Sequence, residues 1–169
     1  AVEHDTMDTT FRSMYLGLSA FLDANTERRE LLLGQRPPRF DSSFDEAIAL
    51  TGDDFERVAL KAESARDYFL LVGPPGTGKT SRALRRMVEH FYAASSMQIL
   101  LLAYTNRAVD EICQSLSSIT PCIDYIRVGS ELSCDVRFRG HLLENILAEC
   151  NSRREVNIRM ADCRVYVGT

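Results

Sequence analysis

Apolar residues in the first third of the chain recur every three or four positions, which is the spacing of one face of a helix. The first such pattern predicts an amphipathic helix over residues 10–23, on Phe11, Met14, Tyr15, Leu18 and Leu22. Three further helices are predicted at residues 26–33, 43–52 and 55–66. Pro37 and Pro38 favour an extended segment before the third helix, and Ser43 with Glu46 has the S-x-x-E form of a capping box at its start. We therefore expect residues 1–66 to form a helical lead-in segment.

The pattern changes at Asp67, where short apolar runs typical of buried strands begin to alternate with helical spacing. Strands are predicted at residues 67–72, 97–104, 124–128 and 163–167. Helices are predicted at residues 80–93, 106–118 and about 140–150. Alternation of this kind is typical of an α/β fold, in which a parallel sheet is joined by right-handed crossovers. Residues 67–169 are therefore expected to be the front part of an α/β domain.

Composition narrows the class of protein. The 169 residues are 45% hydrophobic and 26% charged, values typical of a soluble globular domain. The longest apolar run is far shorter than the roughly 18 residues of a membrane span, and residues 1–10 do not resemble a secretory signal. The net charge of −4 argues against a uniformly basic nucleic-acid-binding surface. We expect a cytoplasmic or otherwise intracellular protein with no membrane association.

Cysteine and histidine spacing does not indicate a metal site or a disulfide framework. The five cysteines are odd in number and include no C-x-x-C pair, so we expect reduced thiols and no disulfide-linked partner. His4, His90 and His141 are isolated from one another and from any metal-binding pattern.

The strongest chemical signal is a glycine-rich segment that follows the apolar run at residues 67–72. It fits the pattern G-x-x-x-x-G-K-[ST] and reads Gly73-Pro74-Pro75-Gly76-Thr77-Gly78-Lys79-Thr80. A strand, a glycine-rich loop and a helix in this order direct backbone N–H groups toward a phosphate. We therefore expect residues 73–81, through Ser81, to bind ATP, with Lys79 on the β- and γ-phosphates and the Thr80 hydroxyl on Mg²⁺. The alternative is a simple glycine-proline turn between two elements.

A second polar segment follows the second predicted strand. Either Thr105 or Asn106 is a suitable N-cap for the next helix. Hydroxyl and amide groups at a helix N-terminus can also bind a phosphate, and a nucleic-acid backbone is the obvious candidate. Ordinary helix capping remains the alternative from spacing alone.

These two segments resemble motifs I and Ia of superfamily 1 helicases, in the branch of the nonsense-mediated-decay and replication nuclease-helicases. Val72–Thr80 matches the first motif and Ala103–Val109 the second, and Val165–Thr169 is similar to the start of a strand that ends in Gly-Thr-Thr. The resemblance implies a RecA-like P-loop NTPase sheet, present in part, that belongs to the first of two motor lobes. It also implies that four residues contact single-stranded DNA or RNA: Thr105, Asn106, Gly168 and Thr169.

The sequence departs from this family at three points. The glutamine that reads adenine in the family is absent from residues 53–57, so ATP selectivity is an open question. No strand ends in Asp-Glu: Asp45-Glu46 lies in the capping box, and Asp110-Glu111 lies inside a helix, where we expect a solvated face. The family's second motor lobe has no match in these 169 residues, and because the chain begins without Met and stops at Thr169 we expect it to be a piece of a larger protein. We expect an ATP-binding first-lobe part of a helicase, which alone would hydrolyse little ATP.

Two other functional classes remain open, and so do the roles of several arginines. The rivals are another P-loop ATPase or small-molecule kinase, and a non-catalytic nucleotide-binding module. Basic residues that could contact phosphates or line a nucleic-acid channel are Arg82, Arg85 and Arg86, the set Arg137, Arg139, Arg153, Arg154 and Arg159, and the pair Arg36 and Arg39. The alternative for each set is a solvent-exposed basic surface with no binding role.

Overall fold

A computed structural model describes residues 9–169, which divide into two compact units, one ending at Arg39 and the other spanning Phe40–Thr169. The first unit holds α1 (Thr9–Asp23) and α2 (Thr26–Leu32), as the helical spacing predicts. Asn25 caps α2, because its side chain accepts a hydrogen bond from the backbone N–H of Arg28 at 2.8 Å. His4 lies outside the described residues.

The second unit begins with a helical hairpin that packs on the helix after the glycine-rich loop. Its helices are α3 (Asp45–Leu50) and α4 (Asp54–Ser64); α3 packs on α4, and α4 packs on α5 (Arg85–Ala94). The capping box predicted at Ser43 is wrong: Asp41 caps a 3₁₀ turn, η1 (Ser42–Phe44), and the turn leads directly into α3. The hairpin is thereby grouped with the α/β part by its contacts, while the sequence boundary after residue 66 stays a prediction.

A histidine joins α4 to α5. The two ring nitrogens of His90 lie 2.9 Å from Glu56 and 3.0 Å from Glu63, both on α4. His90, which the sequence places in no metal-binding pattern, therefore connects the two packed helices.

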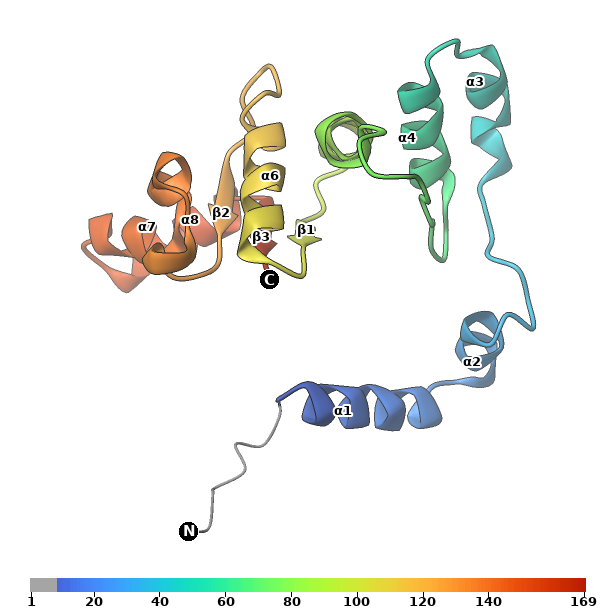
Figure 1. Ribbon diagram of the computed structural model, residues 1–169, viewed down its shortest axis with the longest axis horizontal. Coiled ribbons are helices and arrows are strands. Elements are labelled where there is room, and N and C mark those ends of the chain that lie inside the picture. The colour runs from blue at the N-terminus through green and yellow to red at the C-terminus, as the bar shows by residue number, and fades with distance from the viewer. Residues whose placement is uncertain (1–8) are drawn as a thin grey trace. The chain divides into compact units, whose positions relative to one another are not determined.

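The sheet has three parallel strands in the order β1-β3-β2 (Figure 1). They are β1 (Ile99–Leu102), β2 (Tyr125–Arg127) and β3 (Val165–Gly168), which confirms three of the four predicted strands and the parallel α/β class. Side chains alternate between the two faces, as the pleat of a strand requires. Leu101, Val165 and Val167 face α6 (Asn106–Leu116), and Ile126 packs on the other face.

Two helices follow the second strand and cover the opposite face of the sheet near β2. They are α7 (Leu143–Glu149), preceded by the 3₁₀ turns η3 (Glu131–Ser133) and η4 (Val136–His141), and α8 (Arg153–Asp162). Ile146 of α7 and Cys163 after α8 are buried against Ile126. The sequence did not indicate α8, because its ten residues carry no continuous apolar stripe.

The strand predicted at residues 67–72 is wrong. This apolar run is irregular and pairs with no strand in the described part of the chain, and Leu70 and Val72 are 75% and 92% exposed. A strand is stable only when its backbone N–H and C=O groups have ladder partners, which apolar character alone does not supply. The run nonetheless leads directly into the glycine-rich loop.

Candidate functional site

The glycine-rich loop adopts a backbone shape that side chains at its glycines would disturb. Gly76 and Gly78 have φ angles of 79° and 83°, in the left-handed region that favours glycine. A Cβ on Gly73 would lie 3.0 Å from the Thr77 hydroxyl oxygen, which itself donates a hydrogen bond to the Pro74 carbonyl at 2.8 Å. We refer to this tightly turned loop, residues 73–78, as the glycine cradle.

Lys79 bends back over this cradle. Its ammonium donates hydrogen bonds to the carbonyl oxygens of Gly73 and, at 2.6 Å, of Pro74. No carboxylate pairs with it among residues 9–169. Neutral carbonyl oxygens leave the positive charge uncompensated, so an anion that enters the loop gains a charged partner.

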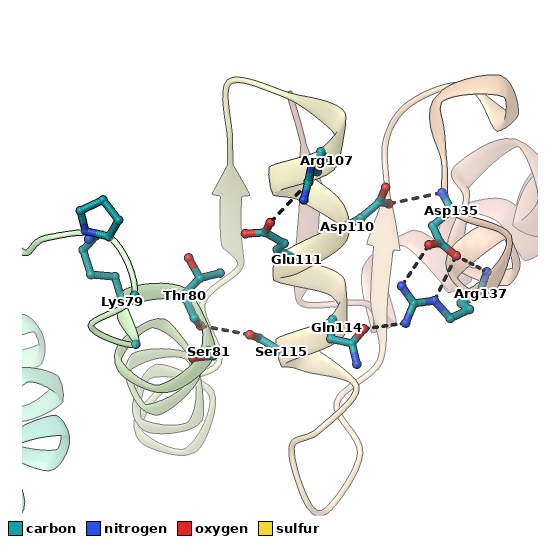
Figure 2. A pocket seen from close by; sticks show the side chains of 13 residues that line it. Lys79, Thr80, Ser81, Arg107, Asp110, Glu111, Gln114, Ser115, Asp135 and Arg137 are labelled. Carbon is teal, nitrogen blue, oxygen red and sulfur yellow. Dashed lines mark hydrogen bonds and ion pairs between the residues drawn. The ribbon is translucent and has the colours of Figure 1, made fainter.

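The helix that starts at Lys79 opens with an unusually wide turn. Residues Lys79–Leu84 (η2) form a π-helical segment, in which the backbone N–H of Ala83 reaches the Gly78 carbonyl at 2.9 Å. The neighbouring helix α6 supports this turn, because the Ser115 hydroxyl donates a hydrogen bond to the Thr80 carbonyl at 3.0 Å (Figure 2). Single π turns of this kind often lie at functional sites.

A pocket of about 710 Å³ lies between the loop and α6. In Figure 2 α6 lies in the middle of the view, with Lys79, Thr80 and Ser81 to one side of it and Asp135 and Arg137 to the other. The α6 side chains that line it are Arg107, Asp110, Glu111, Gln114 and Ser115, and its far wall is Asp135 and Arg137. The sequence predicted the loop side of this pocket. Of the other two walls it singled out Arg137 as a possible nucleic-acid contact, and it treated Asp110-Glu111 as a solvated helix face.

The expectation of a solvated Asp110-Glu111 face is wrong for Asp110. Its carboxylate pairs with Arg127 of β2, whose side chain is only 1% exposed, and also accepts a hydrogen bond from the Asp135 backbone N–H at 3.4 Å. Burial is the largest single influence and disfavours the charge of Arg127, but the hydrogen bond with Asp110 and the electrostatic attraction of Cys134, Asp110 and Cys113 together outweigh it, so the pKa of Arg127 is raised. The Asp110 carboxylate therefore connects α6 to Arg127 of β2 and to Asp135 of the pocket's far wall. The Glu111 side chain, in contrast, is 62% exposed.

The far wall is itself held by an arginine. Arg137 donates hydrogen bonds to Asp135 at 3.0–3.1 Å and to the Gln114 side-chain oxygen at 2.7 Å. Hydrogen bonds from the Arg137 side chain and backbone lower the pKa of Asp135 to about 2. The 3₁₀ turn at residues 136–141 is thus fastened to α6 across the pocket.

The two segments expected to contact nucleic acid lie at the same edge of the sheet. Leu102 pairs with Gly168 in the β1–β3 register, so Thr105-Asn106 and Gly168-Thr169 follow the carboxyl ends of adjacent strands. Thr105 is the N-cap of α6, and its hydroxyl accepts a hydrogen bond from the Ala108 N–H at 3.2 Å, which confirms the capping prediction. The hydroxyl proton is still available to donate.

Most of the basic residues singled out from the sequence are engaged by acidic or aromatic neighbours. Arg82 lies over the Phe55 ring at 4.3 Å, and Arg85 and Arg86 pair with Glu89. The remaining pairs are Arg139 with Glu131, Arg159 with Asp124, and Arg36 and Arg39 with Glu27. Arg153 and Arg154 are exposed at the start of α8. Their role in a nucleic-acid channel stays a prediction.

Residues 9–169 contain no grouping of side chains suited to a metal ion and no disulfide, and all five cysteines are free. His141 stacks on the Tyr125 ring at 3.9 Å. None of the helices described here combines the length and the apolar character that crossing a membrane would require.

A glycine cradle with an uncompensated lysine, opening into a helix that packs on a parallel α/β sheet, defines a P-loop nucleotide-binding domain. The comparison with known protein families agrees, since the model of the AAA domain family (AAA_11) matches residues 50–162. The chain belongs to this family, which implies that it binds a nucleotide.

The chain is also similar to several proteins that are named as helicases. It is 33% identical over 138 residues to the DNA replication ATP-dependent helicase/nuclease JHS1 of Arabidopsis thaliana, covering 75% of this chain and 10% of that protein. It is 32% identical over 108 residues to the putative ATP-dependent RNA helicase ECM32 of Saccharomyces cerevisiae, covering 60% of this chain and 9% of the relative. The human DNA replication ATP-dependent helicase/nuclease DNA2 is 31% identical over 113 residues, covering 60% and 10% respectively.

These relatives confirm the resemblance to superfamily 1 helicases that motifs I and Ia indicated. The chain spans about a tenth of the length of each of the three.

Proposed function

We propose that the chain is the ATP-binding part of a superfamily 1 helicase, an ATP-dependent motor that translocates on single-stranded DNA or RNA. The observation that carries the proposal is the position of Lys79, whose charge is held over the loop by neutral carbonyl oxygens alone. The similarity to ATP-dependent helicases supports the choice of class.

The residues of the loop fit a nucleotide triphosphate with its metal ion. The left-handed glycines leave room for phosphate oxygens close to the backbone, and Lys79 supplies the positive charge. Thr80 and Ser81 line the same pocket, so a hydroxyl is available to a Mg²⁺ ion on the phosphates. When bound, that ion would neutralise charge on the β- and γ-oxygens.

The nucleic-acid track is proposed for the edge where β1 and β3 end. Thr105, Asn106, Gly168 and Thr169 lie there, and ligands of open α/β sheets gather at the carboxyl ends of strands. Thr105 and Asn106 would hold the sugar-phosphate backbone rather than read bases, so binding is expected to be independent of sequence and sensitive to salt.

Hydrolysis is proposed for the intact motor rather than for this chain by itself. The only Asp-Glu pair at the pocket is Asp110-Glu111, within the described residues, and Asp110 is committed to Arg127. Phosphoryl transfer depends on charge stabilisation, and an arginine finger from another lobe contributes about 10³- to 10⁵-fold.

The decisive experiment is a titration with a fluorescent ATP analogue. Lys79→Ala removes a charge-assisted contact worth about 1.5–3 kcal/mol, so the affinity should fall roughly 10- to 150-fold. Lys61→Ala is the matched control, because Lys61 is the chain's other lysine and is exposed on α4. Equal affinity of wild type and Lys79→Ala would refute the nucleotide site.

Competition with ATP, GTP and UTP tests adenine selectivity, since Asp54 pairs with Arg57 where the family has its glutamine.

A further inference from the structure

Ser115 links two elements that are distant in sequence. It is on α6, it is 6% exposed, and its hydroxyl donates to the Thr80 carbonyl at 3.0 Å. Thr80 lies in the π-helical turn directly after the glycine cradle. The hydrogen bond therefore joins α6 to the residue whose hydroxyl is expected to meet Mg²⁺.

The hydrogen bond from Ser115 reaches the helix at its wide π-helical turn. Both Arg82 and Ala83 direct their backbone N–H groups to the single carbonyl of Gly78, each at 2.9 Å. The regular i→i−4 ladder is thus disturbed next to Thr80, in a type of turn that is rare and often lies at functional sites. Ser115 supplies a donor on the side that faces α6, and the burial of its side chain keeps water from competing for the Thr80 carbonyl.

We propose that Ser115 is a positioning residue: through the Thr80 carbonyl it fixes the first turn of the loop helix, so that the Thr80 hydroxyl is oriented for a nucleotide-bound Mg²⁺ ion. This inference rests on the proposed nucleotide site. It assigns to α6, whose other end carries Thr105 and Asn106, an indirect part in metal-dependent nucleotide binding.

The inference predicts a loss of affinity that depends on the metal ion. Ser115→Ala should weaken binding of the fluorescent ATP analogue about 2- to 10-fold in Mg²⁺, the effect of one neutral hydrogen bond. In EDTA the affinity should be the same as that of wild type, because Lys79 and the glycine cradle are untouched. Ser115→Cys, which keeps a similar volume with a weaker donor, should give an intermediate loss.

The matched control is Ser117→Ala, one residue beyond α6. The Ser117 hydroxyl donates a hydrogen bond to the Cys113 carbonyl of its own helix at 2.9 Å and does not contact Thr80, so its loss should affect neither condition. A thermal melt of each variant gives the folded fraction, and affinities are compared per folded molecule.

A double-mutant cycle tests whether Ser115 acts through Thr80. In a Thr80→Ala background, Ser115→Ala should cause no further loss of Mg²⁺-dependent affinity. Equal losses with and without Mg²⁺, or losses that add in the double variant, would overturn the positioning role and leave the nucleotide site intact. Failure of the wild-type chain to bind the analogue in either condition would refute the proposed function itself.

Discussion

The buried pair between Asp110 and Arg127 gives the sharpest prediction about stability. Asp110→Asn keeps the shape of the side chain but removes the charge that faces a guanidinium only 1% exposed. Arg127 would then retain the Ser133 carbonyl, at 3.1 Å, and a neutral amide oxygen as its partners. Breaking one side of a buried ion pair costs about 3–5 kcal/mol. The Asp110 side chain is 22% exposed, so we expect the lower end of this range, about 3 kcal/mol.

The loss is measured by thermal and urea unfolding of the purified chain. For a domain of this size 1 kcal/mol corresponds to about 2–4 °C, so the Tm of Asp110→Asn should fall by roughly 6–12 °C. Glu111→Gln is the matched control, because the neighbouring side chain is 62% exposed and its closest pairing, with Arg107, is 3.9 Å long. Its effect should stay below about 0.5 kcal/mol, as for most exposed pairs.

A paired replacement separates the lost charge from lost packing. Asp110→Leu together with Arg127→Met removes both charges and keeps apolar volume, which is often neutral or stabilising for a buried pair. Most of the lost stability should therefore return. If Asp110→Asn melts within about 1 °C of the wild-type chain, the pair does not hold α6 to β2 and this account of the pocket's far wall is wrong.

Two further predictions concern the strand edge and the far wall. The double variant Thr105→Ala with Asn106→Ala, made in the full-length protein, should weaken binding to labelled single strands and leave nucleotide binding unchanged. If only the melting temperature falls, and strand affinity per folded molecule is unchanged, these residues only cap the helix, a contribution of about 0.5–2 kcal/mol. The pKa of Asp135 falls from its usual 3.8 to about 2 on folding, so its stabilising effect is present above about pH 4 and is lost as the pH falls toward 2. The difference in unfolding midpoint between wild type and Asp135→Asn should therefore shrink over that interval, and a constant difference would show that the Asp135 charge is not responsible.

The sequence alone was sufficient wherever the determining residues are close together in the chain. The glycines of the loop, Lys79 and Thr80 lie within eight residues, so their pattern specifies the cradle before any tertiary contact is known. Local spacing also predicted three parallel strands and narrowed the α6 N-cap to Thr105 or Asn106, of which the structure has Thr105. The match of these motifs to helicases was likewise visible in the sequence, because the motifs are contiguous.

Tertiary structure decided the rest, because it depends on which segments become neighbours. Residues 67–72 have the composition of a strand, but no partner strand pairs with them in the described chain. Arg127 stood in the predicted strand 124–128 as a charge among apolar residues, and only the fold shows that Asp110, 17 positions away, compensates it. Ser115 looked like any polar helix residue until the packing of α6 placed its hydroxyl on Thr80. Local spacing encodes the elements and the loop, whereas the buried polar contacts that support the pocket arise from long-range packing that periodicity does not record.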